Sequence, residues 1–357
     1  SDGGPDFDDR TNTTLESYSV SSRNRLGERW TSTLTAGEGR DDSISISSFG
    51  ESPFETRQRQ YAWQNDLTLP AGLVSLVLER REEKLATTND FAVTTRDTDS
   101  VGAIYQLQQG PWSLQANLRR DDSSQYDAQT TGGIAGGYKA GDWRFTAGYS
   151  TGFRPPSFND LYFPGFSNPN LLPEKARNAE VGAYWTHAMA ASRIEARAVA
   201  YRNRVEDLIV FGCDADFNCR PDNVDRATLQ GVTLGLDAFF GATRVAASVD
   251  IQRPEDEATG NLLPRRARRH GAVQASHAWG PVRVSAEVVA SSYRFDDAAN
   301  TVRMGGYAVF NATADWQVSR SWALYVRGNN LFDRDYQLAA DYSTGGASVI
   351  AGVRASF

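Results

Sequence analysis

Apolar and polar residues alternate along the end of the chain, as they do in a β-strand whose two faces differ. From Val349 to Phe357 every second residue is apolar. The positions between them are mostly polar, as at Arg354 and Ser356, with Ile350 as the one apolar exception. Such a strand suits a sheet with lipid on one side and water or protein on the other. One strand of a soluble sandwich can show the same alternation, so only its recurrence along the chain distinguishes the two folds.

The alternation recurs in about seventeen segments of strand length, separated by turn residues. Short and long connections alternate between the segments. The short ones are rich in Gly, Pro and Asp, which are typical of hairpin turns. The predicted strands are 13–23, 28–38, 56–68, 72–82, 99–109, 111–120, 129–139, 142–152, 177–187, 192–203, 227–240, 242–253, 267–279, 281–292, 307–318, 321–330 and 346–357. Short turns at one end and long loops at the other predict an all-β fold, a transmembrane antiparallel up-and-down β-barrel.

The long connections predicted from this pattern should form the external loops. They span 39–55, 82–99, 121–128, 152–177, 203–226, 254–266, 294–306 and 331–346. Tryptophan supports the same orientation, because all but Trp63 lie near a short turn, where an aromatic girdle would meet the membrane surface. These residues are Trp30, Trp112, Trp143, Trp185, Trp279, Trp316 and Trp322.

Composition narrows the classes of function. The 357 residues carry a net charge of −7 and contain no run of 18 apolar residues, which excludes a transmembrane helix. Basic residues do not alternate with aromatic ones in blocks, so nucleic acid is not an expected partner. The three histidines lie on strands or beside turns without metal-ligand spacing, and no Ser, His and Asp cluster indicates an enzyme.

Two cysteines, Cys213 and Cys219, flank five residues of a polar loop. An oxidising compartment would close this small ring, so we expect a disulfide bond. In the same loop, Asp214 and Asn218 are candidate ligand contacts. A second long connection carries a basic cluster, which consists of Arg265, Arg266, Arg268 and Arg269. These arginines could contact lipopolysaccharide phosphates or pair with acidic residues of the rim.

Three ordered motifs resemble those of the TonB-dependent outer-membrane receptors. The first two lie about halfway along the chain and the third near its end, followed by the terminal phenylalanine. The motif residues are Arg154, Pro155 and Pro156; Asn168, Pro169, Asn170, Pro173 and Glu174; Asn330, Leu331, Phe332, Asp333 and Tyr336; and Phe357. Within the family, stretches such as 200–209, 262–267 and 293–306 look most like the cobalamin (vitamin B12) receptors.

The resemblance implies a location, a function and partners. Members have an N-terminal plug with a TonB box, followed by 22 strands in the outer membrane of a Gram-negative bacterium. Residues 1–357 would supply about 17 of these strands from the C-terminal part, without the plug. The implied function is import of cobalamin or a similar large ligand by a monomer that contacts lipid and lipopolysaccharide, with energy from TonB through the plug. A receptor for a ferric siderophore, haem or saccharide, a passive porin and an adhesive protein remain alternatives.

Aromatic residues of one long loop are the best ligand candidates. They are Phe158, Tyr162, Phe163 and Phe166. Exposed aromatic residues in such numbers need cover, which either the plug or a large, flat, partly apolar ligand would supply. The prolines of the first motif and the Asn and Pro residues of the second have a simpler interpretation as strand-ending and turn residues. No cofactor is expected, except that calcium could lie in external loops, where Asp6, Asp8 and Asp9 are the nearest candidates.

Overall fold

The computed structural model describes residues 10–47, 50–213 and 218–356, including all of their side chains except those of residues 213, 224 and 225. Asp6, Asp8, Asp9, Asp214 and Phe357 therefore lie outside the described residues. The chain divides into two compact units, which we describe separately. Unit 1 comprises Ser1–Gly136, Tyr149–Arg177 and Val205–Asp225, and unit 2 comprises Gly137–Gly148, Asn178–Arg204 and Arg226–Phe357.

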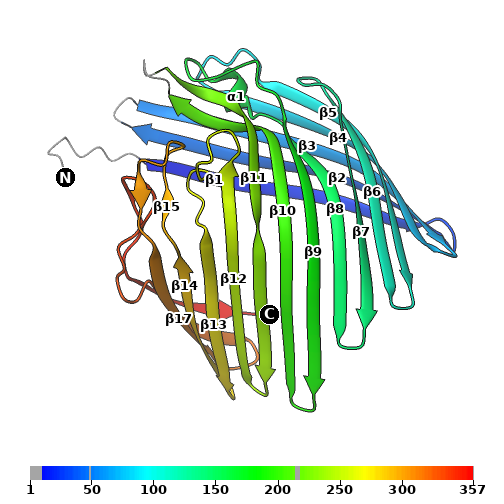
Figure 1. The fold of residues 1–357 in the computed structure, drawn as a ribbon, viewed down its shortest axis with the longest axis vertical. Helices are drawn as coiled ribbons and strands as arrows, with labels where there is room; N and C mark the ends of the chain where they lie inside the picture. The colour runs from blue at the N-terminus through cyan, green and yellow to red at the C-terminus, as the bar shows by residue number, and fades with distance from the viewer. Residues whose placement is uncertain (1–9, 48–49, 214–217, 357) are drawn as a thin grey trace. The chain divides into compact units, whose positions relative to one another are not determined.

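Strands dominate the structure (Figure 1), and seventeen of those described belong to one sheet. These strands are β1 (Arg10–Arg25), β2 (Trp30–Ser47), β3 (Gly50–Leu69), β4 (Gly72–Thr87), β5 (Thr95–Gln109), β6 (Trp112–Ser123), β7 (Gln129–Ala140), β8 (Trp143–Arg154), β9 (Glu174–Met189), β10 (Ser192–Cys213), β11 (Cys219–Phe240), β12 (Thr243–Asp256), β13 (Arg269–Trp279), β14 (Val282–Ser291), β17 (Tyr307–Gln317), β18 (Trp322–Asn329) and β21 (Ser348–Ala355). Each predicted segment overlaps one of them, so the predicted fold class is confirmed.

The sequence did not predict the short elements of the long connections. These are helix α1 (Phe158–Tyr162) and the strands β15 (Arg294–Phe295), β16 (Arg303–Met304), β19 (Gln337–Ala339) and β20 (Tyr342–Ser343). Among the described residues, no helix is long and apolar enough to cross a membrane.

Three predicted long loops are wrong, because the strands on either side continue through most of them. The ranges 39–55, 82–99 and 203–226 lie largely within β2–β3, β4–β5 and β10–β11. In β2 and β3 this extension is polar, and Arg40 pairs with Glu55 at 2.8 Å between Nη2 and Oε2. Alternation of apolar and polar residues ends where a strand leaves the lipid. The hydrogen bonds between the backbones of neighbouring strands do not depend on the side chains, so the strands continue.

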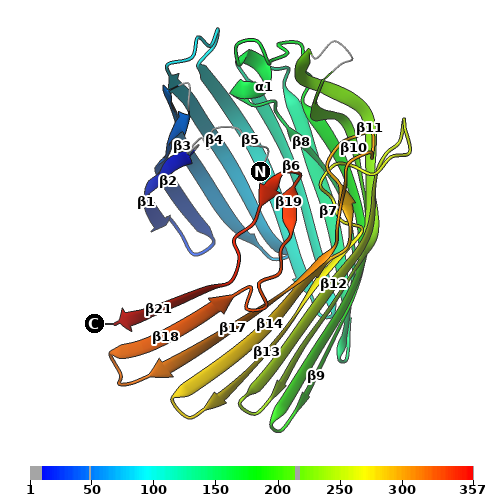
Figure 2. The ribbon, with the colours of Figure 1, turned by 90° about the vertical axis from the view of Figure 1, so that its left-hand side faces the viewer.

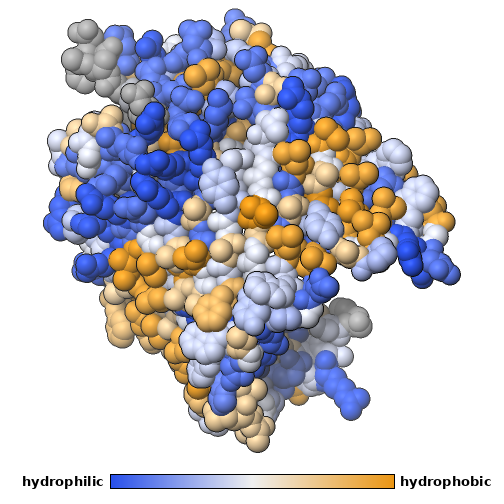
Figure 3. Space-filling model, turned by 45° about the vertical axis from the view of Figure 1, so that its right-hand side comes forward, coloured by the Kyte–Doolittle hydropathy of each residue, from blue (hydrophilic) through white to orange (hydrophobic). Residues whose placement is uncertain are grey.

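In unit 1, strands β1 to β6 pair as consecutive antiparallel hairpins, and their two faces differ. Leu34, Trp63, Leu78 and Val101 fall in register across β2 to β5 and are 45–54% exposed. We call this side the apolar face. On the opposite, polar face, Arg119 pairs with Glu79 at 2.8 Å. Hydrophobic residues of the strands accordingly form exposed patches at the surface (Figure 3).

Unit 2 repeats this organisation in the hairpins β12 to β14, β17, β18 and β21 (Figure 2). Val284, Ala314 and Val326 are cross-strand neighbours on the apolar face. On the polar face, the Asn311 amide donates to Glu287 at 3.0 Å. A slip of one residue would exchange the two faces, so lipid on the apolar side fixes the register of every strand.

In both units, tryptophans lie at the ends of strands beside the short turns. Trp30 and Trp112 begin strands after short turns of unit 1. In unit 2, Trp143 and Trp322 begin β8 and β18, and Trp279 ends β13. All five are 42–60% exposed, as expected for side chains that face a membrane interface. Within each unit, the structure thus places these tryptophans at the turn ends of strands, as predicted.

A glycine on β21 accommodates a tyrosine ring on β18. Gly352 and Tyr325 are cross-strand partners, and a Cβ atom at position 352 would overlap the Cζ and Oη atoms of the ring. Only glycine leaves this space open.

Replacing Gly352 by alanine should therefore force the Tyr325 ring off the strand and destabilise the protein. Overpacking of this kind costs about 1–3 kcal/mol. The midpoint of urea unfolding in detergent micelles measures the change. Gly39→Ala is the control, because a Cβ at Gly39 in β2 meets nothing within 4 Å. Equal midpoints for the two variants would contradict the interpretation.

Candidate functional site

The candidate site lies where the long connections of unit 1 converge around helix α1. β8 ends at Arg154, and Pro155 and Pro156 follow, so the ladder cannot continue. Ser157 then caps the helix: its Oγ accepts a hydrogen bond from the Asp160 amide at 3.1 Å, and Asp160 accepts one from the Ser157 amide at 2.8 Å. This reciprocal cap fixes the helix in spite of its five residues.

The loop aromatics pack on another external loop. Phe158 is buried with Leu85 of β4 and Phe91 of the β4–β5 connection. Phe163 contacts Phe91 edge-to-face, with ring centroids 5.8 Å apart. Phe166 lies 6.3 Å from the Phe163 ring and remains 51% exposed. Of the predicted aromatics, Phe158 is therefore a packing residue and Phe166 is the most available for a ligand, while Tyr162 and Phe163 lie partly buried between them.

Arg96 holds three connections together, and sequence reasoning missed it. This residue at the start of β5 is only 3% exposed. Its Nη2 donates to the Pro156 carbonyl at 2.7 Å and its Nε donates to Gln125 at 2.8 Å. The guanidinium also stacks at 5.0 Å from the Phe158 ring centroid. A lone arginine at a strand end carries no pattern that could have indicated this role.

The second motif anchors the β8–β9 connection to β10 and β11. Glu174 is buried, accepts a hydrogen bond from the Ile209 amide at 2.9 Å and pairs with Arg154 at 3.6 Å. Asn168 donates to Asp222 at 2.9 Å and to the Pro221 carbonyl at 3.2 Å. These contacts agree with the structural interpretation of the motif.

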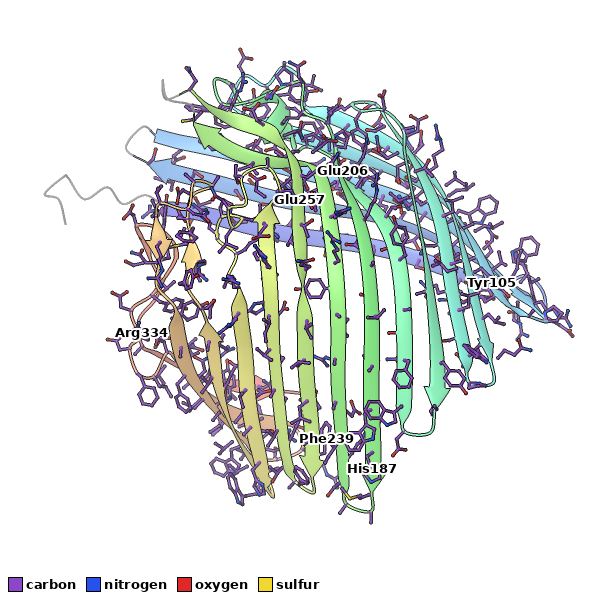
Figure 4. The ribbon with its side chains drawn as sticks, in the orientation of Figure 1. Tyr105, His187, Glu206, Phe239, Glu257 and Arg334 are labelled. Carbon is purple, nitrogen blue, oxygen red and sulfur yellow. The ribbon has the colours of Figure 1, made fainter. Side chains whose placement is uncertain are left out.

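Two further residues of this motif shape the turn itself. Asn170 donates its amide to the Asn168 side chain at 3.1 Å, and Pro173 is buried. Glu206 lies toward the same loop end of β10 (Figure 4) and pairs with Arg177 at 3.4 Å.

The cysteine-bearing connection is partly described. Cys219 begins β11. The side chain of Cys213 lies outside the described residues, so its pairing with Cys219 stays a prediction. Asn218 is exposed just before β11. Its role as a ligand contact, like that of Asp214, stays a prediction.

The third motif, in unit 2, forms a turn after β18 with a buried asparagine at its start. Asn330 has a φ of 48° and is 4% exposed. Its side chain donates to the Arg334 carbonyl at 3.0 Å and accepts from the Arg334 amide at 2.8 Å. Asp333 accepts from the Ala347 amide at 2.9 Å, which joins the turn to β21. The motif therefore shapes the backbone.

The aromatic residues around this turn contact β17. Tyr336 packs 4.3 Å from the Tyr307 ring, and Phe332 lies 5.2 Å from the Phe310 ring. Phe332 is 79% exposed, whereas Leu331 is less so and donates its amide to the Phe310 carbonyl at 2.9 Å.

Carboxylates stabilise the other external connections of unit 2. Arg265 pairs with Asp296 at 2.7 Å, and its guanidinium lowers the pKa of the Asp296 carboxyl. For Asp297, hydrogen bonds from the Val302 and Thr301 amides lower the pKa to about 2. For Arg265, the contact favours the alternative of pairing with the acidic rim. No group of three or more His, Cys, Asp or Glu among the described residues could hold a metal ion, and calcium at Asp6, Asp8 and Asp9 stays a prediction.

A hollow also lies on the apolar face of unit 1, away from helix α1. Its volume is about 830 Å³, and Leu34, Trp63, Leu78 and Val101 line it. Because these side chains face the lipid side, this hollow is separate from the loop site.

Comparison with known proteins agrees with the fold and the motifs. Residues 1–331 match the family model described as TonB dependent receptor-like, beta-barrel. The chain thus belongs to the TonB-dependent receptor family. Its members are transport receptors of the Gram-negative outer membrane, where we place this chain.

Two curated relatives carry the name vitamin B12 transporter BtuB. The protein from Photobacterium profundum is 27% identical over 322 residues, covering 87% of the chain and 52% of the relative. The one from Vibrio vulnificus is 27% identical over 315 residues, covering 85% and 50%. The chain spans about half the length of these relatives.

Solved structures share the fold at lower identity. A ferric enterobactin receptor (PfeA) mutant from Pseudomonas aeruginosa superposes with a TM-score of 0.79 at 15% identity, over 97% of this chain and 62% of that one. The copper transporter OprC gives 0.80 at 14%, over 97% and 66%. These likenesses show the fold and leave the ligand open.

Replacing Arg96 by methionine should loosen the three connections that it joins. The Pro156 carbonyl and Gln125 would lose buried donors, at a cost of about 1–3 kcal/mol. Hydrogen exchange of residues 153–166, followed by mass spectrometry, should become faster. Arg120→Met on β6 is the control, since Arg120 is exposed and its side chain makes one hydrogen bond among the described residues, to Thr130 at 3.4 Å. Unchanged exchange in Arg96→Met would show that the aromatic packing suffices alone.

Proposed function

We propose that the protein that contains this chain imports cobalamin across the outer membrane and that unit 1 receives it at its external loops. Two curated relatives with the vitamin B12 transporter name, each matching more than four fifths of the chain, support this ligand. Energy would come from TonB through a plug, and the protein would act as a monomer in contact with lipid and lipopolysaccharide.

The observation that carries the proposal is the aromatic surface at helix α1. Phe158 and Phe91 are buried beneath it, and Phe166 stays half exposed. A corrinoid is large, flat and partly apolar, and it carries many amides. Aromatic and amide groups contributed by several loops suit such a ligand better than one charged pocket.

The fixed backbone of the loops favours the same function. Arg96, Asn168 and Glu174 each join segments that are far apart in the sequence. A site held by such contacts loses little conformational entropy when it binds a ligand. The alternative ligands, a ferric siderophore, haem or a saccharide, would meet the same surface, so the experiment has to compare them.

Phe166→Ala should weaken the binding of cyanocobalamin to outer membranes that contain the complete gene product. Burial of a phenylalanine side chain against a ligand contributes about 1.5–3 kcal/mol to the binding free energy. Its loss should therefore raise the dissociation constant roughly tenfold or more. Phe332→Ala is the matched control, because Phe332 is equally aromatic, 79% exposed and located in unit 2. The amount of folded protein is measured in parallel.

Two outcomes would count against the proposal. Equal affinity of Phe166→Ala and the parent, with normal assembly, would remove this surface from the site. If a ferric siderophore bound saturably and cyanocobalamin did not bind, the protein would still be a transport receptor, but cobalamin would not be its ligand.

A further inference from the structure

A second cavity lies in unit 2, at the turn ends of β7 to β11. Its volume is about 480 Å³. Figure 4 shows His187 and Phe239 toward the turn ends of β9 and β11. Charged side chains dominate the lining: Lys139, Asp142, Arg144, Arg193, Glu195, Arg197 and Asp237.

The cavity belongs to the polar face of the strands. Trp143 and Phe145 stack on each other with ring centroids 5.9 Å apart, so they share a face of β8. Arg144 lies between them in sequence and points to the other side, where its guanidinium contacts Tyr184 of β9. Alternation therefore places Arg144 and Tyr184 on the polar face, while Trp143 and Trp185 also border the cavity.

The acidic side chains of the lining already have partners in the protein. Asp142 contacts His187 at 2.7 Å, and Asp237 pairs with Arg244 at 2.6 Å. Glu195 pairs with Arg193.

Three cations of the lining lack such partners. Across the described part of the chain, the side chains of Lys139, Arg144 and Arg197 form no ion pair and no hydrogen bond. Beside the paired carboxylates of Asp142, Glu195 and Asp237, the cavity therefore holds three cations that have no ion-pair partner among the described residues.

Two glycines hold the guanidinium groups in position. Arg144 lies 4.1 Å from the centroid of the Tyr184 ring, and this ring folds over Gly182, where a Cβ would come within 2.8 Å of it. On β11, a Cβ at Gly235 would lie 2.6 Å from Nε of Arg197. Arg197 thus rests in the space above Gly235, and Arg144 rests against the ring that lies above Gly182. Among the described residues, neither guanidinium donates to a protein acceptor.

We propose that this cavity binds a small, multiply charged anion with phosphate or carboxylate groups. Guanidinium groups present paired donors that match both kinds of oxyanion, and Lys139 adds a point charge. The volume lies within the range of about 300–1,000 Å³ typical of small-molecule sites. Since the contacts with Tyr184 and Gly235 position the two arginines in advance, little order has to be created on binding.

The test is calorimetric titration of the purified complete gene product in detergent with inorganic pyrophosphate and, separately, with citrate. The parent should bind at least one of them, more weakly as salt rises. The double variant Arg144→Gln/Arg197→Gln should bind about tenfold more weakly or worse, as expected when charge-assisted hydrogen bonds are lost. The preferred anion distinguishes a phosphate site from a carboxylate site.

Two controls separate binding from folding and from net charge. Arg283→Gln removes a cation near the turn end of β14, outside the cavity, and should leave affinity unchanged. Gly235→Ala keeps every charge but displaces Arg197, and should weaken binding. Absence of binding by both anions, or an equal loss in Arg283→Gln and the double variant, would overturn the proposal.

Discussion

Lipid offers no partner for a backbone amide or carbonyl, and this constraint explains the rest of the structure. Every strand within the membrane has to pair with its neighbours, so the sheet continues through hairpin after hairpin. Because successive side chains point to opposite faces, lipid then selects apolar residues at alternate positions only. The neighbours Val284, Ala314 and Val326 on one face, and Glu287 with Asn311 on the other, are the result.

Alternation made the strands predictable and also limited what could be predicted. The seventeen long strands follow from it, because each carries an apolar row. The polar ends of β2 and β3 were assigned to a loop, because pairs such as Arg40 with Glu55 have no hydrophobic pattern. The sequence did not predict the role of Arg96 for a related reason. Its partners belong to other connections, and no local residue spacing indicates that they meet. The roles of Asn168 and Glu174 as anchors were readable, since Asn, Pro and Glu have strong local preferences in turns.

The two candidate sites illustrate different uses of the same sheet. At the loop end, tertiary contacts bury Phe158 and fix the backbone, which leaves Phe166 exposed at the surface. At the turn end of unit 2, the strands themselves build the cavity, and Gly182 and Gly235 provide the space in which Tyr184 and Arg197 lie. The first could be suspected from loop aromatics, whereas the second needed the cross-strand neighbours.

The central claim is that neighbouring residues of one strand face lipid and interior in turn. It is tested most directly by placing a fluorophore on a single cysteine at Val288 or at Glu287 of β14, in the complete gene product reconstituted in brominated lipid. Val288 is 40% exposed on the apolar face, and Glu287 accepts a hydrogen bond from Asn311 on the polar face. Strong quenching at position 288 with weak quenching at 287 is the predicted result. Equal quenching at both positions, or the reverse order, would contradict the account.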